Sequence, residues 1–159
     1  VDGLKTGFTK EAGYCIVTTC KKKDLRLIGV VMNEDKPQTR NEDMKGLLNF
    51  GFSKYQQVKL YNKGEIIDTV KVKDMVEQKI NVVSHKNLYY LYEKTNQKKL
   101  KKKIVYGSLQ LPIDQKRNIG KLILCNNGKA VATYPLYSEK NVKKMSFLDK
   151  LLRVYQSLI

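Results

Sequence analysis

The chain has few of the residues that would cross-link a small domain or hold a metal. Its 159 residues include three cysteines, one histidine and no tryptophan. Cys15 and Cys20 are five residues apart, which on one extended strand places them about 16 Å apart on opposite faces. An odd number of cysteines without Cys-x-x-Cys spacing argues against a disulfide framework and against a metal site. We therefore expect no metal site.

Acidic residues and long apolar runs are also scarce. The chain contains 15 Asp and Glu residues and 31 Lys and Arg residues, which gives a formal net charge of +16. Such a positive field favours polyanions, namely nucleic acid, anionic lipid or an acidic wall polymer, without choosing among them. The apolar runs are much shorter than the roughly 18 residues that a transmembrane helix needs. The apolar fraction of 42% still supplies a core, so the chain is expected to fold.

The first part of the chain has a mixed strand and helix pattern. Residues 14–22 and 25–32 are rich in β-branched and apolar residues, and together they predict a hairpin. A helix is expected from Thr39, because apolar residues then recur at steps of three and four. These helical apolar residues are Met44, Leu47, Leu48 and Phe52.

From about residue 55 the pattern changes to short strand-like segments separated by turn signals. The segments are 58–61, 65–72, 79–83, 87–92, 101–106, 108–111, 119–125 and 130–136. The Asn127-Gly128 pair is a strong hairpin signal between the last two. This spacing predicts a small all-β, sandwich-like domain over residues 55–137.

The last stretch, residues 138–159, predicts an amphipathic helix. Apolar residues recur at steps of three and four, and lysines and arginines fill much of the remaining surface. Two interpretations stay open: the helix docks on the β domain, or it lies in a membrane interface near anionic headgroups. The residues expected to contact a membrane are Met145, Phe147, Leu148, Leu151, Leu152 and Tyr155.

A Lys-Thr-Gly triplet at Lys5, Thr6 and Gly7 precedes the first strand-like run. The lysine offers a cation and the threonine a hydroxyl, which both suit a substrate carboxylate. The glycine leaves the strand open to a ligand backbone. The triplet is one of three motifs of serine acyl-transfer enzymes, but the other two, Ser-x-x-Lys and Ser-x-Asn, do not occur in the 159 residues.

The surroundings of the triplet resemble a known family. Val1-Asp2-Gly3-Leu4-Lys5-Thr6-Gly7 with Ala12-Gly13-Tyr14 is similar to a segment of the serine-type D-alanyl-D-alanine carboxypeptidases, the low-molecular-mass penicillin-binding proteins. The similarity continues through Leu25–Ile28, Val31-Met32, Arg40 and Leu47–Phe52. The similarity is specific in sequence over residues 1–55. Beyond residue 55 it lies only in the order of the parts, a β-rich domain followed by a C-terminal amphipathic helix. It implies an α+β remnant of a transpeptidase-like catalytic domain (1–54), a β-rich domain (55–137) and a membrane-associating helix (138–159).

The resemblance also implies roles for single residues. Lys5 and Thr6 would bind the terminal carboxylate of a D-Ala-D-Ala stem peptide or of a β-lactam, and Gly7 would keep the strand open. The backbone N–H of Phe8 would be one oxyanion donor. Arg40 would support the carboxylate or the triplet. The intact protein would remove the terminal D-Ala from peptidoglycan stem peptides, outside the cytoplasm and peripheral to the cell membrane. The resemblance implies no metal and no organic cofactor.

The missing nucleophile has consequences for the chain by itself. Without the serine there is no acyl-enzyme, so the chain alone is expected to be inert. Its first two strands would leave an apolar edge and face open, which predicts a missing N-terminal catalytic segment as partner, or self-association. The chain begins with Val1, and no signal-peptide pattern follows, which also fits a fragment or a processed product.

Other classes of function stay open at this stage. A non-enzymatic membrane- or cell-wall-binding β module needs only residues 55–159. Nucleic acid is a disfavoured partner, because no recognised motif accompanies the basic run 98–103 and its neighbouring tyrosines. A β-lactamase is conceivable from the triplet alone, but the β domain and terminal helix do not suit it.

Overall fold

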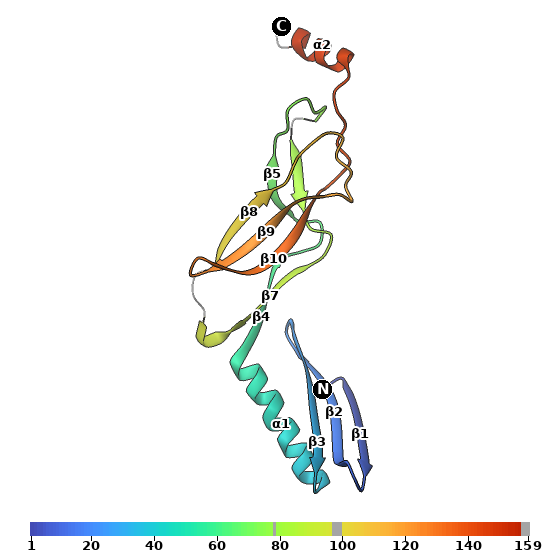
Figure 1. Ribbon diagram of the computed structural model, residues 1–159, viewed down its shortest axis with the longest axis vertical. Helices are drawn as coiled ribbons and strands as arrows, with labels where there is room; N and C mark the ends of the chain where they lie inside the picture. Colours follow the sequence, from blue (N-terminus) through green and yellow to red (C-terminus); the bar gives the residue numbers. More distant parts are fainter. Residues whose placement is uncertain (78, 97–99, 157–159) are drawn as a thin grey trace. The chain divides into compact units, whose positions relative to one another are not determined.

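The computed structural model describes residues 1–77, 79–96 and 100–156, and the chain divides into two compact units (Figure 1). Unit 1 comprises Val1–Val58 and Tyr90–Gln97. Unit 2 comprises Lys59–Tyr89 and Lys98–Ile159. The described part of the chain is mostly β-sheet with two α-helices, so a β-rich chain with a mixed first part is confirmed.

Unit 1 contains a three-stranded antiparallel sheet in the order β1-β2-β3. Its strands are β1 (Gly3–Thr9), β2 (Gly13–Lys22) and β3 (Leu25–Glu34). The expected hairpin is confirmed by β2 and β3, and β1 adds an edge strand that carries the Lys-Thr-Gly triplet. Gly13 has a φ of +61°, and a Cβ there would lie 2.9 Å from the carbonyl oxygen of Glu34, so the turn after β1 requires glycine.

Helix α1 (Pro37–Lys54) covers one face of this sheet. It begins before the expected Thr39, because proline is well suited to the first helical turn. Met44 and Leu48 are buried against Ile16 of β2. Gly29 of β3 permits this close approach, since a Cβ there would lie 2.5 Å from Sδ of Met44.

A further two-stranded sheet is divided between the units: residues 55–58 and 90–93 of its strands belong to unit 1, and residues 59–61 and 88–89 belong to unit 2. Strands β4 (Tyr55–Tyr61) and β7 (Leu88–Glu93) form a two-stranded sheet, and a 3₁₀ turn, η1 (Lys94–Asn96), follows β7. Lys94 Nζ donates to the Phe52 carbonyl oxygen at 2.8 Å, and Lys54 pairs with Glu93 at 3.4 Å. These contacts attach the end of β7 and η1 to the last turn of α1.

Unit 2 is built on a five-stranded antiparallel sheet in the order β5-β6-β10-β9-β8. The strands are β5 (Ile66–Val70), β6 (Ile80–Val83), β8 (Lys101–Tyr106), β9 (Asn118–Asn126) and β10 (Lys129–Ser138). The core of unit 2 is shielded from solvent, since the side chains of Val82, Leu122 and Leu136 are 0% exposed. Asn127 and Gly128 both have positive φ, which confirms the expected Asn-Gly turn between β9 and β10.

The sandwich-like expectation is only partly right. The segment 108–111 is not a strand, and Ile113 instead forms an isolated bridge with Val142. Leu109, Leu111 and Leu60 pack against the core that lies on the inner face of the five-stranded sheet. Non-strand residues together with Leu60 of β4 therefore cover the face that a second full sheet would cover in a sandwich.

The terminal helix is shorter than expected. Helix α2 comprises Phe147–Gln156, and residues 157–159 of the expected helix lie outside the described residues. The start is later because Ser138 ends β10, Val142 bridges to Ile113, and the Met145 N–H donates to the Asp74 carbonyl oxygen at 2.8 Å. Within the described ranges, no helix has the length and apolar character needed to cross a membrane.

Candidate functional site

The Lys-Thr-Gly triplet lies in the middle of β1, which is an edge strand of its sheet. Lys5 is opposite Val17 of β2, Thr6 opposite Ile16 and Gly7 opposite Cys15. Lys5 is exposed, and its Nζ donates to the carbonyl oxygen of Thr6 at 2.5 Å. An edge strand keeps part of its backbone N–H and C=O groups unpaired, so β1 offers both side chains and backbone to a ligand.

Thr6 and Lys5 point to opposite faces of the sheet, as neighbours on a strand do. Thr6 lines a hollow of about 670 Å³ on the face that carries α1, and Arg40 of α1 lines the same hollow. A smaller hollow of about 270 Å³ is lined by Lys5, Thr6, Gly7 and other residues of the three strands. The structure thus brings Thr6 and Arg40 to one hollow, which Lys5 and Gly7 do not line.

Gly7 faces free space. A Cβ at this position would meet no heavy atom within 4 Å. The absence of a side chain is therefore not required by packing in unit 1, in contrast to Gly29. Phe8, which follows, packs its ring against Tyr14 with the ring centroids 4.4 Å apart. This contact holds the β1–β2 hairpin together immediately beyond the triplet.

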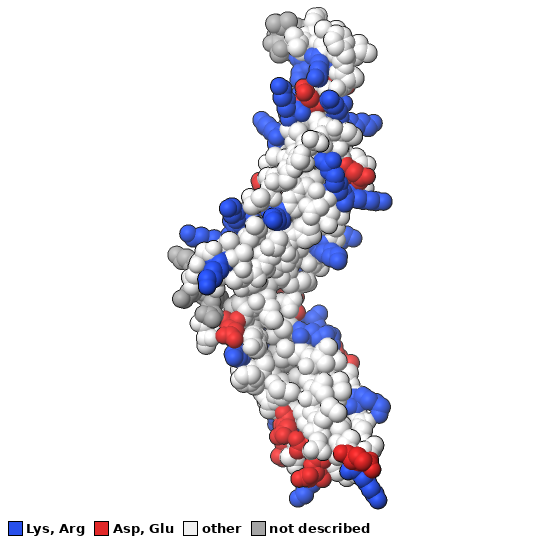
Figure 2. All heavy atoms as spheres, in the orientation of Figure 1, with Lys and Arg blue, Asp and Glu red and all other residues white. Residues whose placement is uncertain are grey.

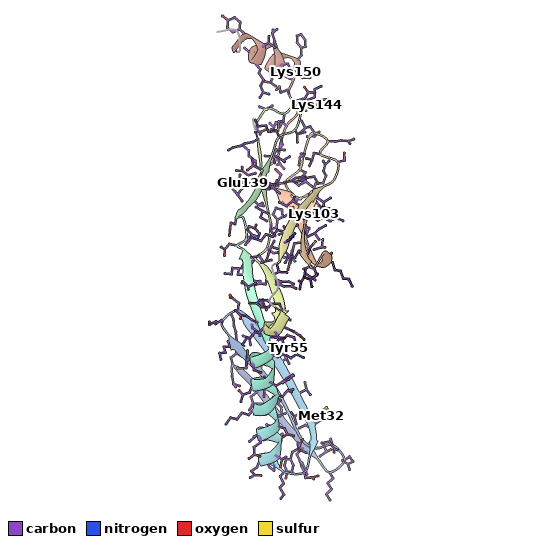
Figure 3. The ribbon with its side chains drawn as sticks, turned by 90° about the vertical axis from the view of Figure 1, so that its left-hand side faces the viewer. Met32, Tyr55, Lys103, Glu139, Lys144 and Lys150 are labelled. Carbon is purple, nitrogen blue, oxygen red and sulfur yellow. The ribbon has the colours of Figure 1, made fainter. Side chains whose placement is uncertain are left out.

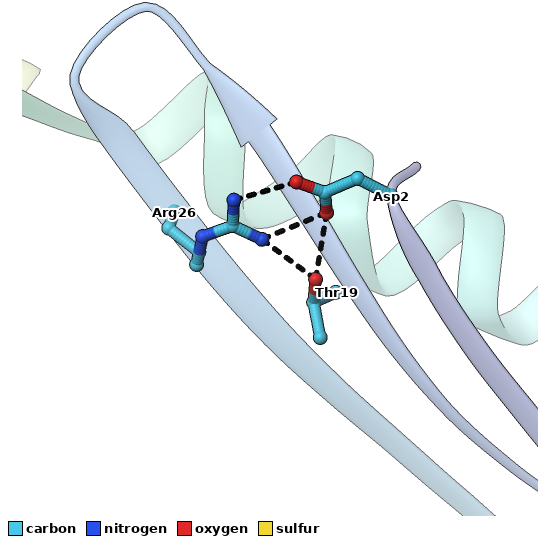
Figure 4. A network of polar contacts seen from close by, with 3 residues as sticks. All are labelled: Asp2, Thr19 and Arg26. Carbon is cyan, nitrogen blue, oxygen red and sulfur yellow. Dashed lines mark hydrogen bonds and ion pairs between the residues drawn. The ribbon is translucent and has the colours of Figure 1, made fainter.

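A polar network at the start of β1 joins all three strands (Figure 4). The Arg26 guanidinium of β3 donates to both carboxylate oxygens of Asp2, and Thr19 Oγ1 of β2 donates to Asp2 Oδ1 at 2.7 Å. The pKa of Asp2 is held far below its usual range, first by the Arg26 hydrogen bond and then by the Thr19 hydroxyl. Because a one-residue slip would exchange the faces of Lys5 and Thr6, this network helps to fix the register of the triplet.

Arg40 has a local partner. Its Nε and Nη2 donate to Asn41 Oδ1 at 3.1 and 2.9 Å. A carboxamide is a neutral acceptor, so the positive charge of the guanidinium is not neutralised by this contact. Arg40 therefore remains a cation at the rim of the larger hollow, on the side of the sheet to which Thr6 points.

A second candidate site is formed by α2 at the C-terminal end of unit 2. Ser146 caps the helix: the Ser146 N–H and Oγ donate to Asp149 Oδ2 at 2.8 and 2.7 Å, and the Asp149 N–H donates to Ser146 Oγ at 3.2 Å. This reciprocal pattern is a capping box. The pKa of Asp149 is lowered by the hydrogen bond from the Ser146 hydroxyl and then by that from the Ser146 backbone.

The loop between β5 and β6 holds α2 in place. Lys150 Nζ lies 3.1 Å from Asp74 Oδ1, and Arg153 Nη2 donates to the Val76 carbonyl oxygen at 2.9 Å. Lys144, which precedes the helix, forms a bridge with Met75. Lys144 and Lys150 are labelled in Figure 3. Two of the basic residues of this segment, Lys150 and Arg153, thus contact the protein itself.

The apolar side chains of α2 face solvent. Exposed fractions range from 57% to 80% for Phe147, Leu148, Leu151, Leu152, Val154 and Tyr155. Met145 differs from the other residues expected at a membrane: it lies before α2 begins and is only 8% exposed. Its side chain belongs to the interior of unit 2, so Met145 is removed from the candidate membrane surface.

The attachment of α2 is expected to weaken in acid. The pKa of Asp74 is lowered chiefly by its hydrogen bond with Lys150. A carboxyl group with a lowered pKa stabilises the folded contact above its unfolded pKa, about 3.8, and this contribution is lost as the pH falls through the folded value. Amide hydrogen exchange in α2 should therefore accelerate, relative to the core strand β9, as the pH is lowered past this range.

The Asp74→Asn variant is the control for the acid effect. It should show faster exchange in α2 at neutral pH, and a smaller further change in acid than the parent chain. Equal protection of α2, after correction for intrinsic exchange rates, at pH 7 and pH 3 in the unmodified chain would contradict this account.

Sequence reasoning missed two groups of residues. The Asp2, Thr19 and Arg26 network joins residues far apart in the sequence, and no local pattern signals it. The Ser146-x-x-Asp149 box was detectable, because a serine three residues before an acidic residue marks a helix start. Recognising that box would have placed the beginning of α2 correctly.

Comparisons with known protein families cover both units. The family described as penicillin-binding protein 5, C-terminal domain, matches residues 55–144. The family described as D-alanyl-D-alanine carboxypeptidase matches residues 1–36. The second match includes the Lys-Thr-Gly triplet, and the first includes the whole five-stranded sheet and the loop that holds α2.

Individual relatives agree with these families. The D-alanyl-D-alanine carboxypeptidase DacF of Bacillus subtilis is 32% identical over 155 residues, covering 96% of this chain and 40% of that protein. DacD of Escherichia coli is 28% identical, covering 95% and 39%. The crystal structure of penicillin binding protein 5 from Haemophilus influenzae matches with a TM-score of 0.77 at 26% identity, covering 88% of this chain and 42% of that one. The chain spans about two fifths of the length of these relatives.

Proposed function

The chain belongs to the family of the penicillin-binding protein 5 C-terminal domain, as the C-terminal portion of a D-alanyl-D-alanine carboxypeptidase, and we propose that the whole protein removes the terminal D-Ala from peptidoglycan stem peptides. It would do so outside the cytoplasm, where this polymer lies. β-Lactams would bind as substrate analogues. The residues of this chain would supply one wall of the active site.

The proposed reaction divides the work between this chain and a serine in the preceding segment. The serine oxygen bonds to the carbonyl carbon of the penultimate D-Ala, and terminal D-Ala leaves as the amine after accepting a proton. Water then hydrolyses the acyl-enzyme and restores the serine. Lys5 and Thr6 would hold the substrate carboxylate, and the Phe8 N–H would donate to the oxyanion.

The observation that carries this proposal is the open space beside Gly7 on an edge strand. Arg40 lines only the larger hollow, and the smaller one is lined by both Lys5 and Thr6. A peptide lying along the free edge of β1 would be within reach of both, and it would add to the sheet as an extra strand. Arg40, on the Thr6 side, would add positive charge near the carboxylate.

Unit 1 has features expected of part of a larger domain. On the face away from α1, four apolar side chains are 44% to 69% exposed, namely Val17, Ile28, Val30 and Met32. Residues 1–54 would accordingly be the end of a transpeptidase-like catalytic domain whose preceding segment covers this face. Without that segment the chain would be catalytically inert. It would also associate with a second copy through this exposed apolar face.

Helix α2 would lie in the interface of an anionic membrane. Its apolar side chains Phe147, Leu148, Leu151, Leu152 and Tyr155 are 57% to 80% exposed, and Lys143 and Lys144 lie just before it. An amphipathic helix with this composition lowers its free energy by burying the apolar face at the headgroup boundary. Residues 55–137 would then hold the catalytic domain at a distance from the membrane.

Vesicle binding tests the role of α2. Leu151→Gln combined with Leu152→Gln should reduce the partition of the chain onto phosphatidylglycerol-containing vesicles about 100-fold or more, because two apolar side chains of roughly 1.5–3 kcal/mol each are lost from the interface. Val131→Gln is the matched control, since Val131 is 41% exposed on β10. Unchanged binding of the double variant would contradict a membrane role for α2.

The proposed activity is tested by D-Ala release from a peptide ending in D-Ala-D-Ala. The parent protein, with the segment that precedes this chain, should release D-Ala and should be acylated by benzylpenicillin. The 159-residue chain alone should do neither, because it has no candidate nucleophile of the Ser-x-x-Lys type. Release by the isolated chain, or no acylation of the parent protein, would overturn the proposal.

A further inference from the structure

The outer face of the five-stranded sheet carries a group of lysines. Lys101 and Lys103 of β8 and Lys121 of β9 are all exposed. Residues between them, such as Ile104 and Leu122, point to the opposite face and belong to the core of unit 2 or pack against it. The alternation of the two strands thus places these three lysines on the outer face, together with Val105 and Ile123. Figure 3 labels Lys103 on β8.

The register places the three lysines close together. Lys103 is opposite Ile123, and Lys121 is opposite Val105. Lys103 and Lys121 are therefore diagonal neighbours on one face, about 7–8 Å apart at their Cα atoms. Lys101 and Lys103 are two residues apart on one strand, about 7 Å. The three form a short row of cations with a spacing that is within one Debye length of about 8 Å.

No acidic residue balances this row. Strands β8, β9 and β10 contain no Asp or Glu. Across the described residues, none of the three lysines takes part in an ion pair or a side-chain hydrogen bond. Unit 2 carries 20 of the Lys and Arg residues against seven Asp and Glu residues, whereas unit 1 carries 11 against eight. Figure 2 shows blue atoms projecting from this region with few red ones among them.

Protection of a sheet edge does not account for the whole row. Lysines on an exposed edge strand discourage pairing with other chains, which explains Lys101 and Lys103 on β8. Lys121 lies on β9, which is paired on both sides, with Val105 of β8 and Pro135 of β10 as its direct neighbours. A cation at that internal position has no edge to protect. Its placement beside Lys103 instead builds a continuous positive strip across two strands.

We propose that this strip, defined by Lys101, Lys103 and Lys121, binds a linear phosphodiester polyanion of the acidic wall-polymer class. Lysine ammonium groups bind phosphates as point charges, and a row of them on an open sheet face suits a repeating chain better than a single small anion. The inference rests on the proposed location outside the cytoplasm, where such a polymer is accessible. It does not require the carboxypeptidase site.

The test uses the full 159-residue chain and poly(glycerol phosphate) at 50 to 200 mM salt. Three neutralised phosphates on a flexible strand give a slope of log K against log salt of about −2, hence a roughly 20-fold loss of affinity over this range. Lys101→Gln, Lys103→Gln and Lys121→Gln together should remove most of that slope and weaken binding about 10-fold or more at 50 mM. D-Ala release by the parent protein should be unchanged by the same three substitutions.

A charge-matched control separates a specific strip from general attraction. Lys71→Gln, Lys79→Gln and Lys116→Gln change the net charge equally at exposed positions outside β8, β9 and β10. This variant should retain nearly all of the affinity. Equal losses in both triple variants would overturn the proposal. A second result would also overturn the proposal: the triple variant of Lys101, Lys103 and Lys121 keeps its affinity for the polymer and loses only its binding to phosphatidylglycerol vesicles. The outer face of the sheet would then be a membrane-binding surface.

Discussion

Replacing Gly7 by valine is expected to abolish most of the activity of the parent protein while leaving the fold of this chain intact. A Cβ at Gly7 meets no heavy atom within 4 Å, and a β-branched residue is well tolerated in a strand. The new methyl groups would occupy the space beside the edge strand where the substrate backbone is proposed to lie. Displacement of the substrate by even 1 Å can cost roughly 100-fold in rate. We therefore expect kcat/KM for D-Ala release to fall by about that factor.

Gly3→Ala is the control for this substitution. Gly3 is on the same strand, four residues before Gly7. A Cβ at Gly3 would make ordinary contacts of 3.4 Å with the Thr19 side chain. The thermal melts of both variants should match that of the unmodified protein. A Gly7→Val variant with unchanged kcat/KM would show that no substrate passes along this part of β1.

The second large effect is expected at Gly120 in the core of unit 2. Gly120→Ala places a Cβ 2.8 Å from the Val105 carbonyl oxygen and 3.0 Å from the Tyr106 ring. The nearest atom is backbone, so β8 must move away from β9 to make room. Overpacking of this kind costs about 1–3 kcal/mol. We expect a loss of that size in the free energy of unfolding, with faster amide exchange in β8 and β9.

Gly107→Ala tests whether the effect at Gly120 comes from the strand contact. The nearest atom to a Cβ at Gly107 is the Ile119 carbonyl oxygen at 3.9 Å, which is an ordinary contact. This variant should stay within about 0.5 kcal/mol of the unmodified chain. Equal stability of the Gly120→Ala and Gly107→Ala variants would mean that β8 and β9 are not as closely packed as the structure has them.

Local sequence patterns predicted the elements whose structure is set by short-range interactions. The β2–β3 hairpin follows from two β-branched runs separated by a Lys-Asp turn, and the β9–β10 hairpin from Asn127-Gly128. Both turns join strands that are adjacent in sequence and in the sheet. No information from distant parts of the chain was needed for either of them.

The errors occurred where distant contacts override the local pattern. Val142 and Met145 have the spacing of a helix face, but Val142 bridges to Ile113 and the Met145 N–H bonds to Asp74. Burial against the β domain gives these positions an apolar character that periodicity cannot distinguish from a helix. The segment 108–111 looks like a strand for a similar reason, since Leu109 and Leu111 pack on the core without pairing.

The Lys-Thr-Gly motif located the candidate site in the sequence, but it did not predict the geometry of the site. The triplet drew attention to Lys5, Thr6 and Gly7, and the structure places them on an edge strand with Lys5 and Thr6 on opposite faces. The Asp2–Arg26 pair that stabilises the start of this strand depends on the order of three strands in the sheet. That order is a tertiary feature, so no pattern near Asp2 could have indicated it.

The most direct test of the account is a crystal structure of the parent protein acylated by benzylpenicillin. The ligand carboxylate should lie at the free edge of β1, within about 3 Å of Thr6 Oγ1 and close to Lys5 Nζ. Its carbonyl oxygen should accept a hydrogen bond from the Phe8 N–H. A ligand whose carboxylate lies away from β1, with Lys5 and Thr6 free of contacts to it, would contradict the assignment of this strand as a wall of the active site.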